Sequence, residues 1–134
     1  MILKDSKAKG SDAERELVRL FWKNGWAAIR VAGSGSSSFP SPDVLASSSA
    51  KGRALAIECK STGNTSKTIS KEQLADLKEF ARLFGAEPWA GIRFGANKWR
   101  FVSLAELEEK KKQTISHDFG DKNGLSFEEL VGNF

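Results

Sequence analysis

The sequence predicts one α/β domain built around a central mixed β-sheet, with its elements in the order helix, strand, strand, strand, helix, strand, strand. Three observations support this prediction. Residues 53–60 alternate as a strand does, residues 11–24 carry apolar side chains at helical spacing, and two strand-like segments flank a Gly-Ala-Asn turn near the middle of the second half. The chain has 134 residues, 40% of them hydrophobic, which suits one compact domain with a single core.

The first helix is expected to begin at Ser11 and to end at Gly25. Its apolar face consists of Ala13, Leu17, Leu20 and Phe21. Ser11 and Glu14 have the spacing of a capping box, in which the carboxylate reaches back to the amide of the capping residue. The same carboxylate could also face a metal ion in an adjoining cleft. The sequence leaves both roles for Glu14 open, and they do not exclude each other.

Three strands are expected next, over residues 26–31, 43–46 and 53–60, with a serine-rich loop over residues 32–42. In the third strand Leu55, Ile57 and Cys59 would face one side, and Ala54, Ala56, Glu58 and Lys60 the other. Glu58 and Lys60 should therefore point the same way, about 6.6 Å apart along the strand. The small side chains of the two alanines leave room for a helix to cross this face.

The rest of the chain predicts two further helices and two further strands. Ser70 and Gln73 form a second capping box and begin a helix that Gly85 ends. Residues 88–94 and 98–102 predict two strands joined by a tight turn, whose aromatic side chains should mostly pack in the core, with some available for a dimer face. Ser103 is expected to cap a charged helix that runs to about Lys112.

The pair Pro42-Asp43, followed by Glu58-x-Lys60, supplies the residue types of a metal-dependent phosphodiesterase. Two carboxylates can hold a hard divalent cation such as Mg²⁺, and an ammonium beside them can orient a water and stabilise the extra charge of the transition state. The backbone carbonyl of Cys59 is a further candidate metal ligand. Taken alone, the Glu-x-Lys spacing is a weak motif and is more typical of an edge strand with one apolar face and a solvated, charged end.

The chain resembles the archaeal Holliday junction resolvases, a family of the PD-(D/E)xK nuclease superfamily. The resemblance runs from about residue 9 to about residue 102, and its motifs occur in order. The matching stretches are Lys9-Gly10, Ala13-Glu14-Arg15-Glu16-Leu17, Gly25, Arg30, Ala32-Gly33-Ser34, Pro42-Asp43, Ile57-Glu58, Lys60, Phe80-Ala81-Arg82, Phe84-Gly85 and Trp99-Arg100-Phe101. It implies a restriction-endonuclease-like fold for this single domain.

The resemblance also implies a role for each matching site residue. Asp43 and Glu58 correspond to the metal-binding acids, Lys60 to the catalytic lysine, and Glu14 to the helix acid that completes the site. Arg15 and Arg30 correspond to phosphate-contacting arginines, and Ser34 lies in the flexible Gly-Ser loop. The plainer alternatives are a solvated helix residue for Arg15 and a strand residue paired with an acid for Arg30. For Arg30 the phosphate-contacting role is favoured, because a charge inside an otherwise apolar strand needs a partner.

Charge and composition agree with a nucleic-acid partner. Residues 1–102 carry 17 Lys and Arg against 10 Asp and Glu, whereas residues 103–134 carry 4 against 7. A polyanion is therefore favoured for the first segment. Lys67, in the polar loop over residues 61–69, could close over a DNA backbone or could lie in an ordinary solvated connection. Within the domain we expect a flexible N-terminus over residues 1–8, a nuclease core over 9–102, and a C-terminal helix and tail over 103–134.

The sequence and the resemblance together predict a Mg²⁺-dependent DNA endonuclease that acts on four-way junctions as a homodimer, with Mn²⁺ able to replace Mg²⁺. One cysteine and the lack of a long apolar run or leader predict a cytoplasmic protein with no membrane contact. His117 is the only histidine, which excludes a zinc cluster and a histidine-based triad. The alternatives are another endonuclease of the superfamily, of restriction or repair type, and a basic DNA-binding module without catalysis.

Overall fold

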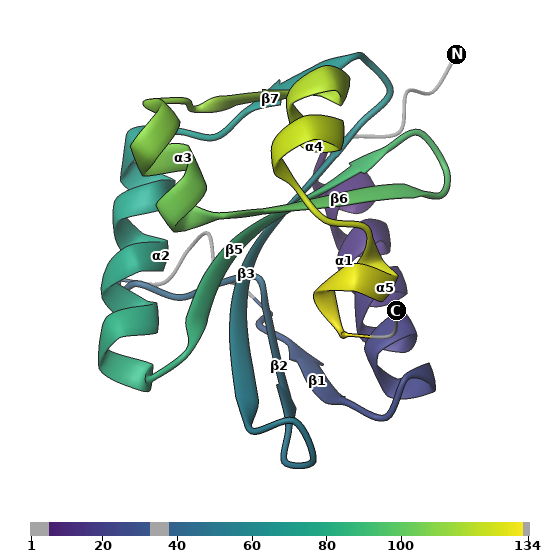
Figure 1. Ribbon diagram of the computed structural model, residues 1–134, viewed down its shortest axis with the longest axis vertical. Coiled ribbons are helices and arrows are strands. Elements are labelled where there is room, and N and C mark those ends of the chain that lie inside the picture. The colour runs from purple at the N-terminus through teal and green to yellow at the C-terminus, as the bar shows by residue number, and fades with distance from the viewer. Residues whose placement is uncertain (1–5, 33–37, 133–134) are drawn as a thin grey trace.

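A five-stranded mixed sheet organises the chain (Figure 1), of which the computed structural model describes residues 6–32 and 38–132. The strand order is β1-β2-β3-β5-β6; β3 and β5 are parallel, and the other neighbours are antiparallel. The predicted α/β fold with a central mixed sheet flanked by helices is confirmed. The elements are α1 (Ser6–Lys23), β1 (Ala27–Arg30), β2 (Val44–Ser48), β3 (Arg53–Thr62), β4 (Ser66–Thr68), α2 (Lys71–Phe84), β5 (Glu87–Phe94), β6 (Lys98–Ser103), α3 (Leu104–Lys110), β7 (Thr114–Ser116), α4 (His117–Asn123) and α5 (Phe127–Leu130).

Helices cover both faces of the sheet. The α1 and α5 helices pack against one face, where the largest apolar cluster lies, and α2 and α3 pack against the other (Figure 1). The expected alternation of β3 explains this division: Leu55, Ile57 and Cys59 belong to the α1 cluster, whereas Ala56 lies under α2 with Leu77. The small Ala56 side chain lets α2 approach β3 closely, as predicted.

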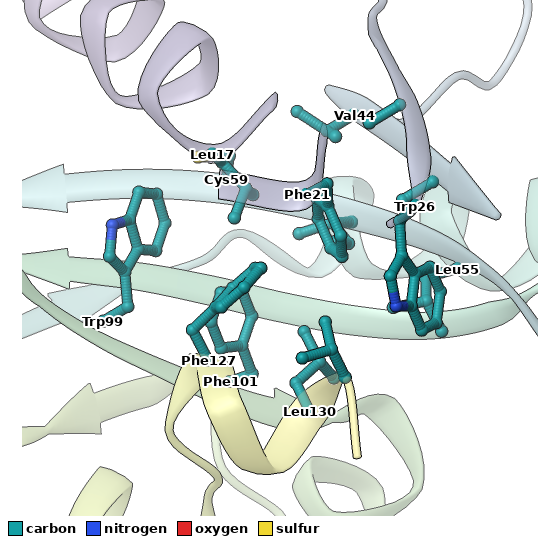
Figure 2. Close-up of a cluster of buried hydrophobic side chains, with 14 of the residues drawn as sticks. Leu17, Phe21, Trp26, Val44, Leu55, Cys59, Trp99, Phe101, Phe127 and Leu130 are labelled. Atoms are coloured by element: carbon teal, nitrogen blue, oxygen red, sulfur yellow. The ribbon is translucent and has the colours of Figure 1, made fainter. Parts of the chain in front are cut away.

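The C-terminal segment contributes to the main core. Phe127 and Leu130 of α5 point into the same cluster as Phe21 of α1 and Leu55 of β3 (Figure 2). The ring of Phe127 lies 5.1 Å from that of Phe21, in an edge-to-face arrangement, and 6.1 Å from that of Phe101. Residues after 102 therefore complete the core of the sheet.

Two predicted element boundaries at the N-terminus are wrong. The α1 helix begins at Ser6, so Ser11 lies inside the helix and does not cap it, and Glu14 cannot serve as its capping-box partner. Residues 6–8, expected in a flexible N-terminus, are helical; residues 1–5 lie outside the described part of the chain. The local Ser-x-x-Glu pattern is satisfied by a different partner, Arg30, which becomes available only when β1 packs beside α1.

Most of the other predicted boundaries are confirmed. Ser70 caps α2 with both hydrogen bonds of the capping box, and Gly85 ends the helix in the left-handed conformation with φ 84°. Ser103 caps α3, which ends at Lys110. The aromatic side chains of β5 and β6 pack inward: Phe94, Trp99 and Phe101 are buried, and Trp89 is partly buried.

A second, two-stranded sheet was not predicted. The segment 61–69, expected to be a loop, continues β3 to Thr62 and then forms β4, which pairs with β7. The hydroxyls of Thr68 and Thr114 are 2.7 Å apart across this pair. The two strands have three residues each, which is too few for a visible alternation. None of the helices in the described part of the chain is long and apolar enough to span a membrane.

Candidate active site

Asp43 lies where three strands of the sheet meet. Its backbone N–H donates to the carbonyl of Ile57 in β3, and its carbonyl accepts from the N–H of Val31, just after β1. The pairing of β2 with β3 ends at the neighbouring pair Val44 and Ile57. Beyond that point Asp43 Oδ2 accepts a hydrogen bond of 2.8 Å from the backbone N–H of Cys59. The carboxylate thus continues the contact between the two strands after the backbone ladder has stopped.

Glu58 and Lys60 extend from the part of β3 that runs past β2. Both lie on the same side of the strand, as predicted, and the ammonium Nζ of Lys60 is 3.6 Å from Glu58 Oε2. Glu58 is buried, with 9% of its side chain exposed, whereas 21% of the Lys60 side chain is exposed. Neighbouring β5 continues alongside as far as Phe94, which keeps this stretch of β3 in a regular strand.

Glu14 reaches the same region from α1. Arg30, at the end of β1, donates from Nε to Glu14 Oε1 at 2.9 Å and from Nη2 to the hydroxyl of Ser11 at 3.0 Å. This geometry is the plainer of the two alternatives for Arg30, a strand cation paired with an acid. The side chain of Glu14 is 14% exposed. The helix and the first strand are therefore joined by a charged contact beside the acids of β2 and β3.

The charge of Asp43 raises the pKa of two neighbouring acids, Glu14 and Glu58. Burial, and next the charge of Asp43, raise the pKa of Glu58 to about 8, although Lys60 acts in the opposite direction. Burial and then Asp43 also raise the pKa of Glu14, against the effect of Arg30. Carboxyl groups held this close disfavour ionisation together, and Lys60 and Arg30 offset this effect only in part. The site concentrates more negative charge than its own lysine and arginine neutralise.

These residues fit a Mg²⁺ ion that takes only a few of its ligands from the protein. Among the described residues no three His, Cys, Asp or Glu side chains converge closely enough to hold an ion, and Glu14 is bonded to Arg30 instead. Mg²⁺, however, is usually held by one or two carboxylates together with waters and substrate phosphates. Asp43 and Glu58 supply that pair. The carbonyl of Cys59 faces the Asp43 side of β3, because the N–H and C=O of one strand residue point to the same side.

A family model for archaeal Holliday junction resolvases (Hjc) matches residues 5–134 of the sequence. The chain belongs to this family. The crossover junction endodeoxyribonuclease Hjc of Archaeoglobus fulgidus is 40% identical over 129 residues, which cover 96% of this chain and 93% of the relative. The corresponding enzyme of Methanocaldococcus jannaschii is 34% identical over 124 residues, covering 92% and 87%.

Solved structures agree with the family assignment. The structure of Archaeoglobus fulgidus Hjc, a Holliday junction resolvase, superposes with a TM-score of 0.81 at 37% identity and covers 92% of this chain and 100% of that one. A bacterial homing endonuclease superposes with a TM-score of 0.55 at 17% identity, covering 84% and 75%, and shares the fold. The resemblance predicted from the sequence motifs is confirmed.

Of the residues besides Arg30 that are expected at the DNA-binding surface of this resolvase-family chain, Arg15 and Lys67 are described, and neither forms an ion pair with the acids of the site. Arg15 is 55% exposed on α1, and its nearest ion-pair partner is Asp12 at 3.8 Å. Lys67 lies on β4, not on a loop, and among the described residues it makes no hydrogen bond or ion pair with the acids. Ser34 lies outside the described residues. Their roles on DNA stay predictions.

Sequence reasoning missed a polar cluster that fixes α1 over this resolvase-type site. Glu16 accepts 2.7 Å and 2.8 Å hydrogen bonds from Arg93 Nη1 of β5 and Trp99 Nε1 of β6. Arg93 also donates to the hydroxyl of Ser61, one residue after Lys60. The position of Glu14, two residues before Glu16, is thereby set. The signal was present: Arg93 is a charge within an otherwise apolar strand, the same feature that marked Arg30.

Proposed function

We propose that this chain is a structure-specific endonuclease that resolves four-way (Holliday) DNA junctions by paired cuts in opposed strands, with Mg²⁺ as its cofactor and Mn²⁺ as a substitute. One observation carries the proposal: half-buried Asp43 lies beside buried Glu58, with Lys60 in contact, at the end of the β2–β3 ladder, in a chain of the resolvase family. Because this substrate is intracellular DNA, we expect the protein to act in the cytoplasm.

The proposed catalytic residues are Glu14, Asp43, Glu58 and Lys60. Asp43 and Glu58 would hold the metal ion, with the Cys59 carbonyl as a backbone ligand and Glu14 beside them. When bound, Mg²⁺ polarises a scissile phosphate and lowers the pKa of a coordinated water. The hydrogen bond from Cys59 N–H fixes the Asp43 carboxylate, so it needs no reorganisation to accept a cation.

Lys60 has two functions in this mechanism. Its ammonium, 3.6 Å from Glu58, lowers the pKa of that carboxyl against the effects of burial and Asp43, and its partial exposure lets it reach a phosphate at the surface. We propose that it orients the attacking water and stabilises the negative charge that develops on the phosphate oxygens. The proton of the attacking water would pass to solvent or to a neighbouring carboxylate, and the bond to the leaving 3′ or 5′ oxygen would then break.

The proposed DNA-binding residues are Arg15, Arg30, Ser34 and Lys67. Exposed Arg15 is suited to a flanking phosphate without further change. Arg30 is already bonded to Glu14 and Ser11, so a phosphate contact would use its remaining N–H donors. Contacts of this kind position the backbone and read no bases, so recognition of the junction would rest on its shape.

We propose a homodimer, since two opposed strands must be cut and one chain carries one such site. An apolar face consisting of Ile29, Leu45, Phe80 and Phe84 supports this. Ile29 and Leu45 pair across β1 and β2, and Leu45 and Phe80 pack against the same cluster at α2. Ile29 and Phe84 are 59% and 57% exposed, and the rings of Phe80 and Phe84 stack at 5.1 Å. Aromatic side chains left exposed together are typical of interfaces.

The direct test of the proposed function is a cleavage panel. End-labelled immobile four-way junctions, linear arms, flaps and mismatched duplexes would be incubated with the protein and Mg²⁺, Mn²⁺ or EDTA. We expect symmetric nicks in opposed strands of the junction with either metal and none with EDTA. Equal cutting of linear DNA would instead indicate a restriction- or repair-type endonuclease. Junction binding without cutting in either metal would indicate a non-catalytic DNA-binding module.

A further inference from the structure

A groove of about 580 Å³ lies between α2 and α3, away from the acids. Its floor is apolar: Leu104 and Leu107 of α3 are buried beneath it, and Leu74 of α2 is only partly buried. Gln113 closes one end, where its side-chain amide donates to the carbonyl of Ile69. The groove is therefore built from rigid, hydrogen-bonded elements and keeps an apolar surface open to a ligand.

Lysines form the rim of this groove. Lys71 and Lys78 extend from α2, and Lys111 and Lys112 follow α3. Lys78 is paired with Glu108 at 2.7 Å, but the ammonium groups of the other three make no ion pair with any residue of the described chain. We call this site, lined by Lys71, Leu74, Leu107, Lys111 and Lys112, the lysine groove. It combines unneutralised positive charge with an apolar floor.

We infer that the lysine groove binds an acidic peptide segment of a partner protein, with carboxylates on the lysine rim and an apolar side chain on Leu74. Charge complementarity selects an anionic partner. The apolar floor selects a peptide over nucleic acid, because a phosphodiester backbone has no side chain that would gain by burial against leucines. The helix pair resembles the apolar grooves that receive side chains of bound peptides at regular spacing.

The lysine groove and the apolar face proposed for the homodimer lie on different flanks of α2. At 3.6 residues per turn, Lys71, Leu74 and Lys78 share one flank of the helix, and Phe80 and Phe84 share another. Leu77 and Ala81, between these flanks, face the sheet. A dimer formed through the apolar face would leave the groove of each protomer open, so the inference does not depend on the proposed nuclease activity or on the oligomeric state.

The test uses a short fluorescein-labelled peptide in which glutamates surround a central pair of leucines. Fluorescence anisotropy would measure its binding to the full chain, to a triple variant with Lys71→Ala, Lys111→Ala and Lys112→Ala, and to a matched control with Lys23→Ala, Lys51→Ala and Lys122→Ala. Both variants lose the same charge from exposed positions. A second peptide with serines in place of the leucines tests the apolar floor.

We expect the groove variant to bind the peptide about tenfold more weakly than the wild type, and the control variant to bind within about twofold. The serine peptide should also bind more weakly to the wild type. Equal losses in both variants, or no binding of the leucine peptide to the wild type, would overturn the inference. So would a groove variant that loses affinity for four-way DNA as strongly as for the peptide, because the groove would then be part of a DNA-binding surface.

Discussion

Asp43 Oδ2 accepts a 2.8 Å hydrogen bond from the backbone N–H of Cys59, one residue after Glu58. This contact replaces the ladder bond that β2 would have supplied had it extended further along β3. It holds the Asp43 carboxylate at a fixed position relative to Glu58. Both acids lie where β2 no longer pairs with β3. Other polar contacts around the acids connect further elements. Arg30 of β1 bonds to Glu14 of α1, and Arg93 of β5 bonds to Glu16 of the same helix.

Stability without metal should depend on pH through Glu58. Its pKa is raised from 4.5 to about 8 in the folded chain, so the folded state binds more protons than the unfolded state between these values. The free energy of unfolding should therefore fall by a few kcal/mol as pH rises from 4.5 to 8, and Glu58→Gln should remove the part that Glu58 contributes and leave only that of Glu14. Urea unfolding in EDTA at several pH values measures it.

Bound Mg²⁺ should offset the loss of stability that accompanies ionisation of Glu58 at high pH, because a bound cation favours the ionised carboxylate. At pH 8, saturating Mg²⁺ should raise the melting temperature of the wild type and leave that of Glu58→Gln nearly unchanged. The control Asp121→Asn should show the same rise in melting temperature as the wild type, since that acid lies on α4 and is paired with Arg100. An equal rise in all three proteins would show that Mg²⁺ binds elsewhere.

Removal of Arg30 should destabilise the fold more than removal of Arg15. Arg30→Met leaves the largely buried Glu14 without its partner and should destabilise the fold by about 1–3 kcal/mol. It should also raise the Glu14 pKa further, since Arg30 now lowers it. Arg15→Met removes an exposed charge and should leave stability nearly unchanged. It should reduce the slope of the logarithm of the junction-binding constant against the logarithm of salt concentration by about one. Similar unfolding curves for the two variants would contradict the assignment.

The exposed aromatic pair on α2 should control the oligomeric state. Phe84→Asp places a charge in the proposed dimer face and should give a monomer in analytical ultracentrifugation. Such a monomer should lose paired cutting while keeping single nicks. Ala75→Asp is the matched control, since it puts the same charge on the other flank of the same helix. A dimer that persists in Phe84→Asp would exclude this face.

The C-terminal segment should be required for folding. Phe127→Ala removes a buried ring that contacts Phe21 and Phe101, and should destabilise the chain by about 3 kcal/mol or more. Leu83→Ala, at a position 70% exposed, should change stability by about 0.5 kcal/mol or less. Denaturant unfolding measures both. A small effect of Phe127→Ala would mean that the tail is dispensable to the core.

Local patterns in the sequence predicted the parts of the structure that depend on neighbouring residues. The alternation of β3 places Glu58 and Lys60 together, and the capping box of Ser70 begins α2, because both are short-range effects. The same capping pattern misplaced the start of α1, since Ser11 and Glu14 are bonded to Arg30, 16 and more residues away. A local signal cannot show which of two partners a side chain will take.

Long-range contacts account for the rest of what the sequence did not reveal. The pairing of β4 with β7, the packing of α5 into the core and the bond between Asp43 and Cys59 all join distant segments. The lysine groove also forms only when α2 and α3 lie side by side. Residue types told us which groups were present, and the topology decided which of them meet.

The substitution Asp43→Asn tests the central claim most directly. The amide oxygen can still accept the hydrogen bond from Cys59, so the fold should be retained while the charge needed for a cation is lost. Cleavage of a labelled four-way junction in Mg²⁺ and binding of the same junction in EDTA would be measured side by side. We predict that cleavage falls by at least about a hundredfold with binding nearly unchanged. Cleavage close to that of the wild type, or an equal loss of binding, would contradict a metal-holding role for Asp43.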